Sequence, residues 1–167
     1  PDKGILAADE STSTITKRLA SIHVESTVDT RQRYRDLLFT TPGVEEHISG
    51  VILYDETIKQ SSVSGTPFPK LLASKGIIPG IKVDKGAKPL ARFPEETVTE
   101  GLDGLRERLI EDRNLGARFA KWRAVIRIGK GLPTSNALLA NAEALARYAA
   151  RCQENELGPI VEPEVLM

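Results

Sequence analysis

Charged residues placed within short apolar segments are the part of this sequence best suited to chemistry. Three pairs stand two positions apart: Lys82 with Asp84, Lys121 with Arg123, and Glu162 with Glu164. Side chains two apart in a β-strand point to the same face. A parallel strand is normally covered on both faces and almost continuously hydrophobic, so charges inside one need an opposite charge or a ligand. The three pairs therefore mark a candidate site.

The chemistry that such a cluster supports is proton transfer on an anionic substrate. If the strands are parallel neighbours, their carboxyl ends bring together carboxylates and cations from Asp9, Lys82, Asp84, Lys121, Arg123, Glu162 and Glu164. A carboxylate crowded by another can donate a proton, and a lysine among cations loses its own more easily. Structural alternatives remain open, because any one strand-end charge can simply reach solvent, and Lys121 with Arg123 can be buried against a carboxylate. For Glu162 and Glu164, two like charges on one face favour a function.

Five short segments rich in Ile, Val, Leu or Ala predict the strands that would carry these charges. They are Gly4–Ala8, Gly50–Tyr54, Ile77–Val83, Phe119–Ile128 and Pro159–Val165. Between these segments, apolar residues recur at the spacing of a helix. The helical patterns are Ile15, Leu19 and Ile22 after an N-cap at Ser11 or Thr12; Tyr34, Leu37 and Leu38; the short segment Pro67–Ser74; Leu102, Leu105 and Leu109; and Ser135–Asn155. In the last, the apolar stripe comprises Leu138, Ala142, Leu145, Ala149 and Cys152, which predicts that Cys152 lies in the core.

Strands that alternate with helices predict the α/β class, with parallel strands joined by right-handed crossovers. Such a chain forms either a doubly wound sheet or a βα barrel, and a barrel places its active site at the carboxyl ends of the strands. The Gly-x-Gly-x-x-Gly fingerprint and the Gly-x-x-x-x-Gly-Lys-Ser/Thr loop are both missing from the sequence, which argues against the common nucleotide sites. We expect a single domain over residues 1–167, with surface loops at Ser61–Thr66 and Gly86–Glu96.

Composition narrows the class of protein further. The 167 residues include 23 Lys plus Arg and 23 Asp plus Glu, a formal net charge of zero, so nucleic acid and anionic lipid are not expected partners. No segment approaches the roughly 18 apolar residues of a membrane span and no leader-like segment opens the chain, so we expect a soluble, intracellular protein. The single cysteine and the isolated His23 and His47 have no metal-ligand spacing. We expect neither a metal nor a cofactor, although a carboxylate-only metal site stays open.

Eight segments carry a more specific signal and cover nearly the whole chain. In order they are Lys3–Ser11 (KGILAADES), Lys17–Leu19 (KRL), Gly50–Leu53 (GVIL), Gly80–Gly86 (GIKVDKG), Gly101–Leu105 (GLDGL), Phe119–Arg123 (FAKWR), Leu145–Ala149 (LARYA) and Pro159–Leu166 (PIVEPEVL). Together they resemble class I fructose-bisphosphate aldolase, the metal-independent type that forms a Schiff base. The resemblance implies a (β/α)8 TIM barrel, of which about the first five βα units are present. The candidate strand starts are about 39 residues apart on average, so eight units need roughly 310, a length that suits this barrel.

The resemblance also implies roles for individual residues. Asp9 matches an aspartate that assists proton handling around the bond being cleaved. Glu162 matches the general acid and base of Schiff-base formation and turnover, and Glu164 is its neighbour in the hydrogen-bond network. Lys121 matches the lysine that contacts the substrate and the covalent intermediate. These four residues are the implied catalytic set.

Five further positions match the family's substrate-binding segments. Lys82 and Arg123 complete the cationic cluster. Ser11, Lys17 and Arg18 match the segment that meets one substrate phosphate, and a helix N-terminus beside a serine and two cations suits such an anion. Without the resemblance, Lys17 and Arg18 would be read as ordinary surface charges.

The reaction that the resemblance implies is reversible cleavage of fructose 1,6-bisphosphate into dihydroxyacetone phosphate and glyceraldehyde 3-phosphate. It implies a phosphorylated sugar as substrate, a homotetramer as assembly, and the cytoplasm as compartment, with the plastid as an alternative. The family's Schiff-base lysine lies on the strand after the paired glutamates, so we expect it beyond Met167. Two alternatives stay open: a non-catalytic fragment or scaffold with the same fold, and another Schiff-base sugar-phosphate aldolase on the same barrel.

Overall fold

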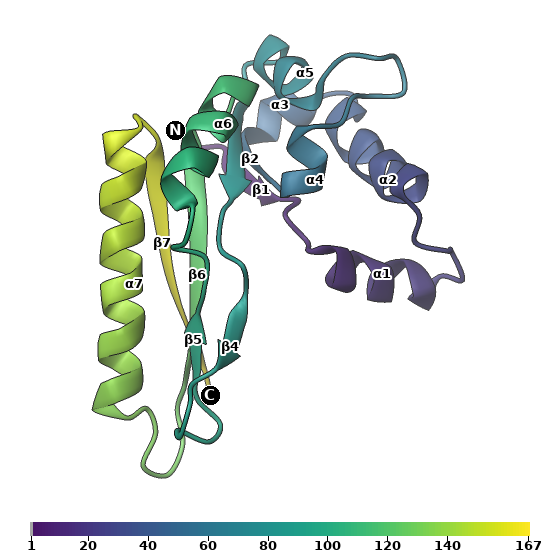
Figure 1. Cartoon of the computed structure of the whole chain (residues 1–167). Coiled ribbons are helices and arrows are strands. Elements are labelled where there is room, and N and C mark those ends of the chain that lie inside the picture. The colour runs from purple at the N-terminus through teal and green to yellow at the C-terminus, as the bar shows by residue number, and fades with distance from the viewer. Residues whose placement is uncertain (1) are drawn as a thin grey trace. The chain divides into compact units, whose positions relative to one another are not determined.

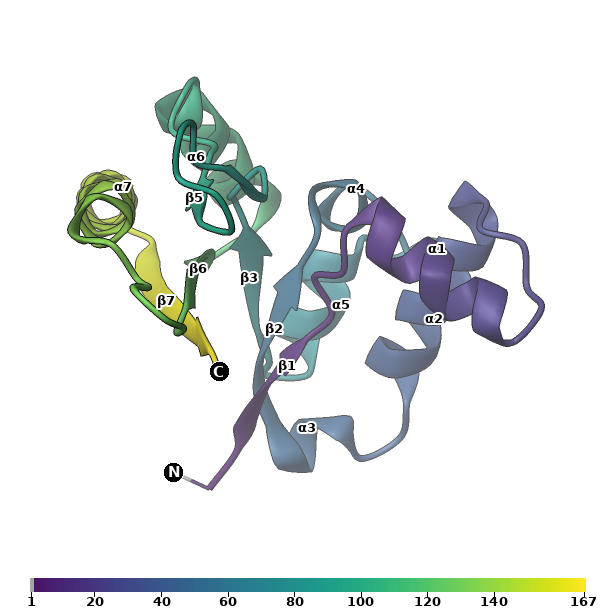
Figure 2. The same cartoon turned by 90° about the horizontal axis from the view of Figure 1, so that it is seen from below.

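The computed structural model describes residues 2–167, which divide into two compact units. Unit 1 comprises the chain up to Lys82 together with Asn114–Arg118, and unit 2 comprises Val83–Arg113 together with Phe119–Met167. Within each unit, parallel strands alternate with helices, as Figure 1 and the view from below in Figure 2 show. This alternation is what the sequence pattern predicts for the α/β class.

Unit 1 contains a parallel sheet of three strands in the order β1-β2-β3. The strands are β1 (Gly4–Ala7), β2 (Ile48–Leu53) and β3 (Ile78–Lys82). The helices are α1 (Thr12–Ser21), α2 (Val28–Thr40), α3 (Val44–His47), α4 (Asp55–Ile58) and α5 (Phe68–Ser74). Phe39 and Phe68 meet edge to face in the apolar core of this unit, with ring centroids 5.1 Å apart.

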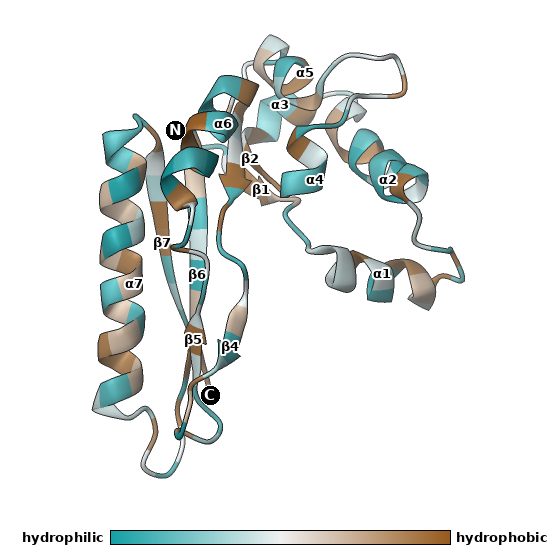
Figure 3. Ribbon diagram, in the orientation of Figure 1, coloured by the Kyte–Doolittle hydropathy of each residue, from teal (hydrophilic) through white to brown (hydrophobic). Residues whose placement is uncertain are grey.

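Unit 2 contains the parallel pair β6 and β7, beside the long helix α7. The strands β6 (Phe119–Arg127) and β7 (Gly158–Leu166) pair along their full lengths, and α7 spans Ser135–Glu154. The helix α6 (Leu105–Leu115) lies mostly in this unit. A short antiparallel hairpin, β4 (Ala87–Pro89) and β5 (Thr97–Thr99), completes it. Figure 3 shows hydrophobic and hydrophilic residues interleaved along α7 and β6.

All five predicted strands occur, and every boundary lies within two residues of its predicted position. Helix starts follow capping chemistry. The Ser11 hydroxyl accepts a hydrogen bond from the backbone N–H of Thr14 at the start of α1, and Thr134 does the same for Ala137 at the start of α7. At α2, Thr27 and Thr30 form a reciprocal capping box. Two one-turn helices, α3 and α4, were not predicted because four residues carry too little periodicity.

The segment Gly86–Glu96 lies largely at the surface, as predicted, but it is not only a loop, because it contains β4, which pairs with β5. The hairpin is joined to β6 through threonine hydroxyls. Thr97 Oγ1 lies 3.3 Å from the carbonyl oxygen of Val125, and Thr99 Oγ1 donates a 2.8 Å hydrogen bond to that of Arg123. These strands of three residues are too short and too polar to stand out as periodic patterns.

The buried residues of α2 and α1 differ in part from the predicted ones. In α2 the buried residues are Arg31, Arg35 and Phe39, whereas the predicted Leu37 is 67% exposed. In α1, Ile15 and Leu19 are buried as predicted, but Ile22 lies after the helix end and is exposed.

In α7 the buried face is rotated from the predicted apolar stripe. Leu138 and Ala142 are exposed, and the buried face comprises Ala137, Asn141, Ala144, Leu145, Tyr148 and Cys152. The core position of Cys152 is confirmed, and burial raises the pKa of its thiol to about 12.

The backbone at Gly101 offers a test of the packing in unit 2. Its φ is +132°, and a Cβ there would lie 2.9 Å from the backbone nitrogen of Lys85 and 3.2 Å from the Trp122 ring. Gly104, with φ +61° and open space around it, is the matched control. We expect Gly101→Ala to lower the free energy of unfolding by about 2–4 kcal/mol and Gly104→Ala by about 1 kcal/mol. Urea titration of the two variants checks this, and equal losses would contradict the close packing around Gly101.

Candidate functional site

Strand β6 separates a buried apolar face from a polar one. Trp122 is fully buried and packs at a tilt against Tyr148 of α7, with 5.5 Å between the ring centroids. Lys121 and Arg123 flank Trp122 in the sequence and therefore lie on the opposite face of the strand. The helix thus covers one face of this strand pair, and the predicted site residues belong to the other.

Two ion pairs cross from β6 to β7 on the polar face. Nζ of Lys121 lies 2.9 Å from Oε2 of Glu162, and Nε of Arg123 donates a hydrogen bond to Oε2 of Glu164. In the strand register Lys121 is opposite Ile160 and Arg123 is opposite Glu162, so each cation reaches the carboxylate two residues further along β7. The structure brings these four predicted residues together as two diagonal ion pairs. The same pairing agrees with the alternative that Lys121 and Arg123 are simply neutralised by carboxylates.

The two pairs differ in how far they are shielded from water. The Arg123 side chain is 42% exposed and that of Glu164 37%, and their hydrogen bond holds the pKa of Glu164 below its ordinary value. The same hydrogen bond raises the pKa of Arg123. The Lys121 side chain is only 13% exposed. The Lys121–Glu162 pair is therefore the less hydrated one.

Oε2 of Glu162 is the atom of this pair most suited to proton transfer. It is shielded from solvent and receives no well-aligned hydrogen bond, although the Lys121 ammonium lies beside it. The structure therefore places one shielded carboxylate oxygen beside an ammonium group on the polar face of β6 and β7. Carboxyl and ammonium groups are side chains that can exchange protons with a bound group.

Two buried side chains hold the backbone of Arg123. Oδ2 of Asp84 accepts a 3.3 Å hydrogen bond from its N–H, and Thr99 donates to its carbonyl oxygen. Asp84 is 7% exposed and Thr99 2% exposed. Asp84 belongs to the predicted charged cluster, and its carboxylate accepts hydrogen bonds from the backbone N–H groups of Gly86 and Arg123. Thr99 was missed, because nothing in the sequence distinguishes a threonine that anchors a neighbouring strand.

Asp9 and Lys82 lie at one edge of the sheet in unit 1. Ala7 and Gly80 both stand level with Ile52 in the strand register, so Asp9 and Lys82, two residues further on, also share one level at the carboxyl edge. Asp9 is 9% exposed and Lys82 is half-buried. The predicted position at the carboxyl ends of the strands is therefore observed for both.

The residues predicted for phosphate binding extend along α1 from its N-cap, Ser11, to its last turn, which contains Arg18. Ser11 is the N-cap, and its hydroxyl lies 3.0 Å from those of Ser13 and Thr14. Lys17 is exposed. Arg18 is also largely exposed, but its guanidinium donates a hydrogen bond to the carboxylate of Glu10, a residue that sequence reasoning did not assign.

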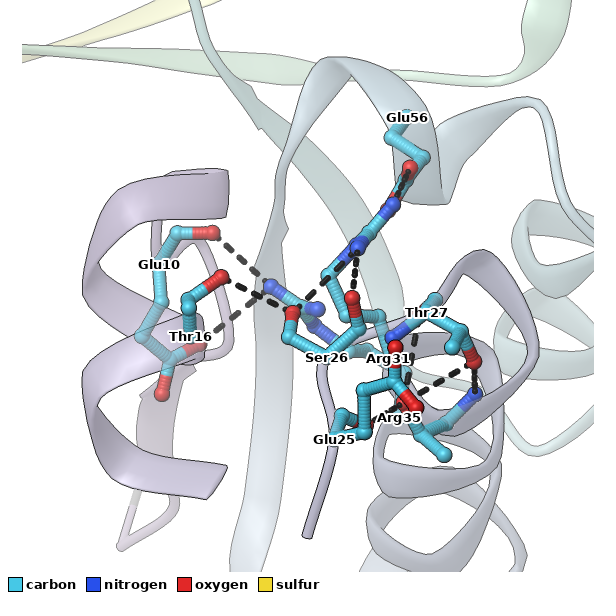
Figure 4. A network of polar contacts seen from close by, with 9 residues as sticks. Glu10, Thr16, Glu25, Ser26, Thr27, Arg31, Arg35 and Glu56 are labelled. Carbon is cyan, nitrogen blue, oxygen red and sulfur yellow. Dashed lines mark hydrogen bonds and ion pairs between the residues drawn. The ribbon is translucent and has the colours of Figure 1, made fainter. Parts of the chain in front are cut away.

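A network of polar contacts between the α1 region and α2 was not predicted (Figure 4). Arg31 binds the carboxylate of Glu56 through two hydrogen bonds, of 2.8 and 2.6 Å. Arg35 is 1% exposed and donates a 2.8 Å hydrogen bond to the backbone carbonyl of Glu10, while burial lowers its pKa. The only sequence signal was the spacing of the two arginines by four residues, one turn of a helix with few apolar residues.

Neither a metal-binding cluster nor a membrane-spanning helix occurs among the described residues. Among residues 2–167, no group of three or more His, Cys, Asp or Glu side chains is placed to hold a metal ion. No helix in that same range is long and apolar enough to cross a membrane.

Comparison with known proteins decides the family. The family described as "Glycolytic: Fructose-bisphosphate aldolase class-I" matches residues 1–167. This chain belongs to the class I fructose-bisphosphate aldolases. A probable class 1 aldolase of Xanthomonas campestris is 62% identical over the whole chain, and cytosolic aldolase 6 of Arabidopsis thaliana is 59% identical. The chain spans about half the length of these aldolase relatives, 50% and 47% respectively.

The fold of a solved aldolase agrees with this membership. The aldolase of Plasmodium falciparum, crystallised with TRAP and a small-molecule inhibitor, is 54% identical to this chain. The match has a TM-score of 0.96 and covers 99% of this chain and 48% of the other. The predicted fold class is confirmed: the chain is part of an aldolase TIM barrel, with five parallel strands and alternating helices.

The electrostatics of the Arg123–Glu164 pair can be tested directly. We expect Arg123→Gln to raise the pKa of Glu164 towards its ordinary value, because the hydrogen bond and the positive charge that favour the carboxylate are removed. Carbon-detected NMR titration of the glutamate carboxyl groups measures the change. Arg127→Gln, on the same strand but paired with Glu95, is the control and leaves the pKa of Glu164 where it is. An unmoved Glu164 in the Arg123 variant would show that the pair is not formed in solution.

Proposed function

We propose that the protein containing this chain cleaves fructose 1,6-bisphosphate reversibly to dihydroxyacetone phosphate and glyceraldehyde 3-phosphate, in glycolysis and gluconeogenesis. The observation that carries the proposal is the shielded Lys121–Glu162 pair on the polar face of β6 and β7, in a chain of the class I aldolase family. A Schiff-base lysine beyond Met167 completes the site.

The proposed chemistry begins with the lysine amine, which adds to the substrate ketone and forms an iminium as water leaves. A base then takes the proton of the hydroxyl group next to the bond that breaks. The electron pair of that carbon–carbon bond moves to the iminium nitrogen, which gives an enamine and releases the aldehyde. Protonation of the enamine carbon and hydrolysis of the resulting iminium release the ketone phosphate and regenerate the amine.

Residues of this chain supply the proton transfers in the proposal. Glu162 protonates the departing hydroxyl during iminium formation and takes the proton back during hydrolysis; its place beside Lys121 on the polar face of β6 and β7 supports this role. Lys121 stabilises the negative charge that develops next to it. Glu164 holds Arg123 in place, and Asp9 handles the proton at the bond being cleaved.

Substrate binding is assigned to the cations. Ser11, Lys17 and Arg18 receive one substrate phosphate beside α1: Ser11 is its N-cap, where backbone N–H groups favour an anion, and Lys17 and Arg18 supply positive charge from further along the helix. Lys82 and Arg123 contact the polar groups of the sugar phosphate.

Assembly and compartment are proposed by family membership. We propose a homotetramer and a cytoplasmic location, the latter supported by the Arabidopsis relatives named cytosolic.

Borohydride trapping tests the proposed reaction. With dihydroxyacetone phosphate and borohydride, the protein that contains this chain and the rest of the barrel should become covalently labelled on one lysine beyond Met167. The isolated 167-residue chain is the control and should remain unlabelled. Cleavage of other sugar phosphates in preference to fructose 1,6-bisphosphate would favour a different Schiff-base aldolase, and the absence of both labelling and cleavage would refute the proposal.

The role of Glu162 is tested by Glu162→Gln in the same protein. We expect kcat to fall about 10²- to 10⁴-fold with little change in KM, because the amide cannot exchange a proton but fills the same space. Glu154→Gln, an exposed glutamate of α7 paired with Arg106, is the control and should leave both constants unchanged. Unchanged kcat in the Glu162 variant would remove Glu162 from its assigned role.

A further inference from the structure

The buried Arg35 makes an incomplete pair with Glu10. One turn earlier on α2, Nε and Nη2 of Arg31 donate hydrogen bonds to the two carboxylate oxygens of Glu56. Nη2 of Arg35, by contrast, lies 3.7 Å from Oε2 of Glu10, and its buried Nε has no acceptor. Arg31 thus forms a two-hydrogen-bond pair, or fork, with its carboxylate. Arg35, on the same helix face, has a carboxylate nearby but no such fork.

The Glu10 carboxylate also pairs with a second cation. Its Oε1 accepts hydrogen bonds from Arg18 and, at 3.4 Å, from the Tyr34 hydroxyl, while Oε2 receives none. The Glu10 side chain is 8% exposed, Arg18 is 59% exposed and Arg35 is 1% exposed. One carboxylate is therefore shared between an arginine at the surface and an arginine in the interior.

Only the carboxylate has to move to complete the inner fork. Nη2 of Arg35 already donates a 2.8 Å hydrogen bond to the backbone carbonyl of Glu10, which holds the guanidinium against the segment between β1 and α1. A hydrogen bond of this kind needs about 2.9 Å between nitrogen and oxygen, so Oε2 of Glu10 has to approach Nη2 of Arg35 from its present 3.7 Å.

We propose that Glu10 exchanges partners when a phosphate binds beside α1: Arg18 leaves Glu10 for the phosphate, and Glu10 closes onto Arg35 in a fork like that of Arg31 and Glu56. The proposal rests on the proposed function, which assigns a substrate phosphate to Arg18. The exchange moves the carboxylate away from the incoming anion. It also gives the interior cation a complete partner, and this offsets part, but not all, of the loss of the Arg18–Glu10 contact.

The exchange makes Glu10 a competitor of the phosphate and Arg35 a positioning residue. Glu10→Gln should tighten phosphate binding by about twofold to fivefold, because a neutral amide holds Arg18 less strongly. Arg35→Lys should weaken it by up to about tenfold, because a lysine keeps the charge but cannot form the fork. In the Glu10→Gln background, Arg35→Lys should have no further effect on phosphate affinity, since the carboxylate that moves is absent.

The experiment is a calorimetric titration of inorganic phosphate into the protein that contains this chain and the rest of the barrel. Arg31→Lys is the matched control: the same substitution one turn away, in a fork that is already complete, should lower stability without changing the phosphate dissociation constant. Should Arg35→Lys not fold, Glu10→Gln decides, and unchanged or weaker phosphate binding in that variant overturns the exchange.

Arg18→Ala separates this inference from the proposed function. If Arg18→Ala weakens phosphate binding while Glu10→Gln and Arg35→Lys leave it unchanged, the exchange is wrong and the phosphate assignment stands. If Arg18→Ala itself has no effect, the phosphate assignment fails and the exchange fails with it. An equal loss from Arg35→Lys with and without Glu10 would also overturn the exchange, because a purely structural role predicts additive effects.

Discussion

Removing a guanidinium or an ammonium from water costs several kcal/mol unless a carboxylate lies within reach. This cost governs the polar groups of both units. In unit 2, Lys121 has Glu162, and in unit 1, Arg31 has Glu56. Each partner comes from a different helix or strand, so the charges tie elements together as well as balancing one another. The cations can stay inside because the fold brings carboxylates to them.

The register of β6 and β7 places the paired charges together on one face. On β6 and β7 the offset between cation and carboxylate is two residues for both pairs, so one alignment satisfies both at once. A slip of one residue would place the glutamates of β7 on the opposite face from their partners. The backbone of Arg123 is held as well: Thr99 of the hairpin donates a hydrogen bond to its carbonyl oxygen, and Asp84 accepts one from its N–H. The geometry of the two ion pairs is thus set by backbone pairing more than by the side chains themselves.

The segment between β1 and α1 combines several roles over a few residues. Asp9 sits at the sheet edge, Glu10 reaches back to α2, and Ser11 starts the helix that is proposed to meet a phosphate. A phosphate bound at α1 would therefore act next to a residue proposed to handle protons. Arg35 holds the Glu10 backbone carbonyl, and the proposed exchange lets the Glu10 carboxylate change partners.

The sequence by itself determined the five strands, the alternation with helices and the positions of the charged pairs, because these depend on periodicities of two and 3.6 residues that are local in the chain. It also supplied the family, through segments such as PIVEPEVL. Only the tertiary structure decided that Lys121 meets Glu162 rather than Glu164, that Arg31 and Arg35 are buried while Leu37 is exposed, and that β5 lies against β6. These outcomes depend on register and on which helix face finds a partner, and both are set by residues far apart in the sequence.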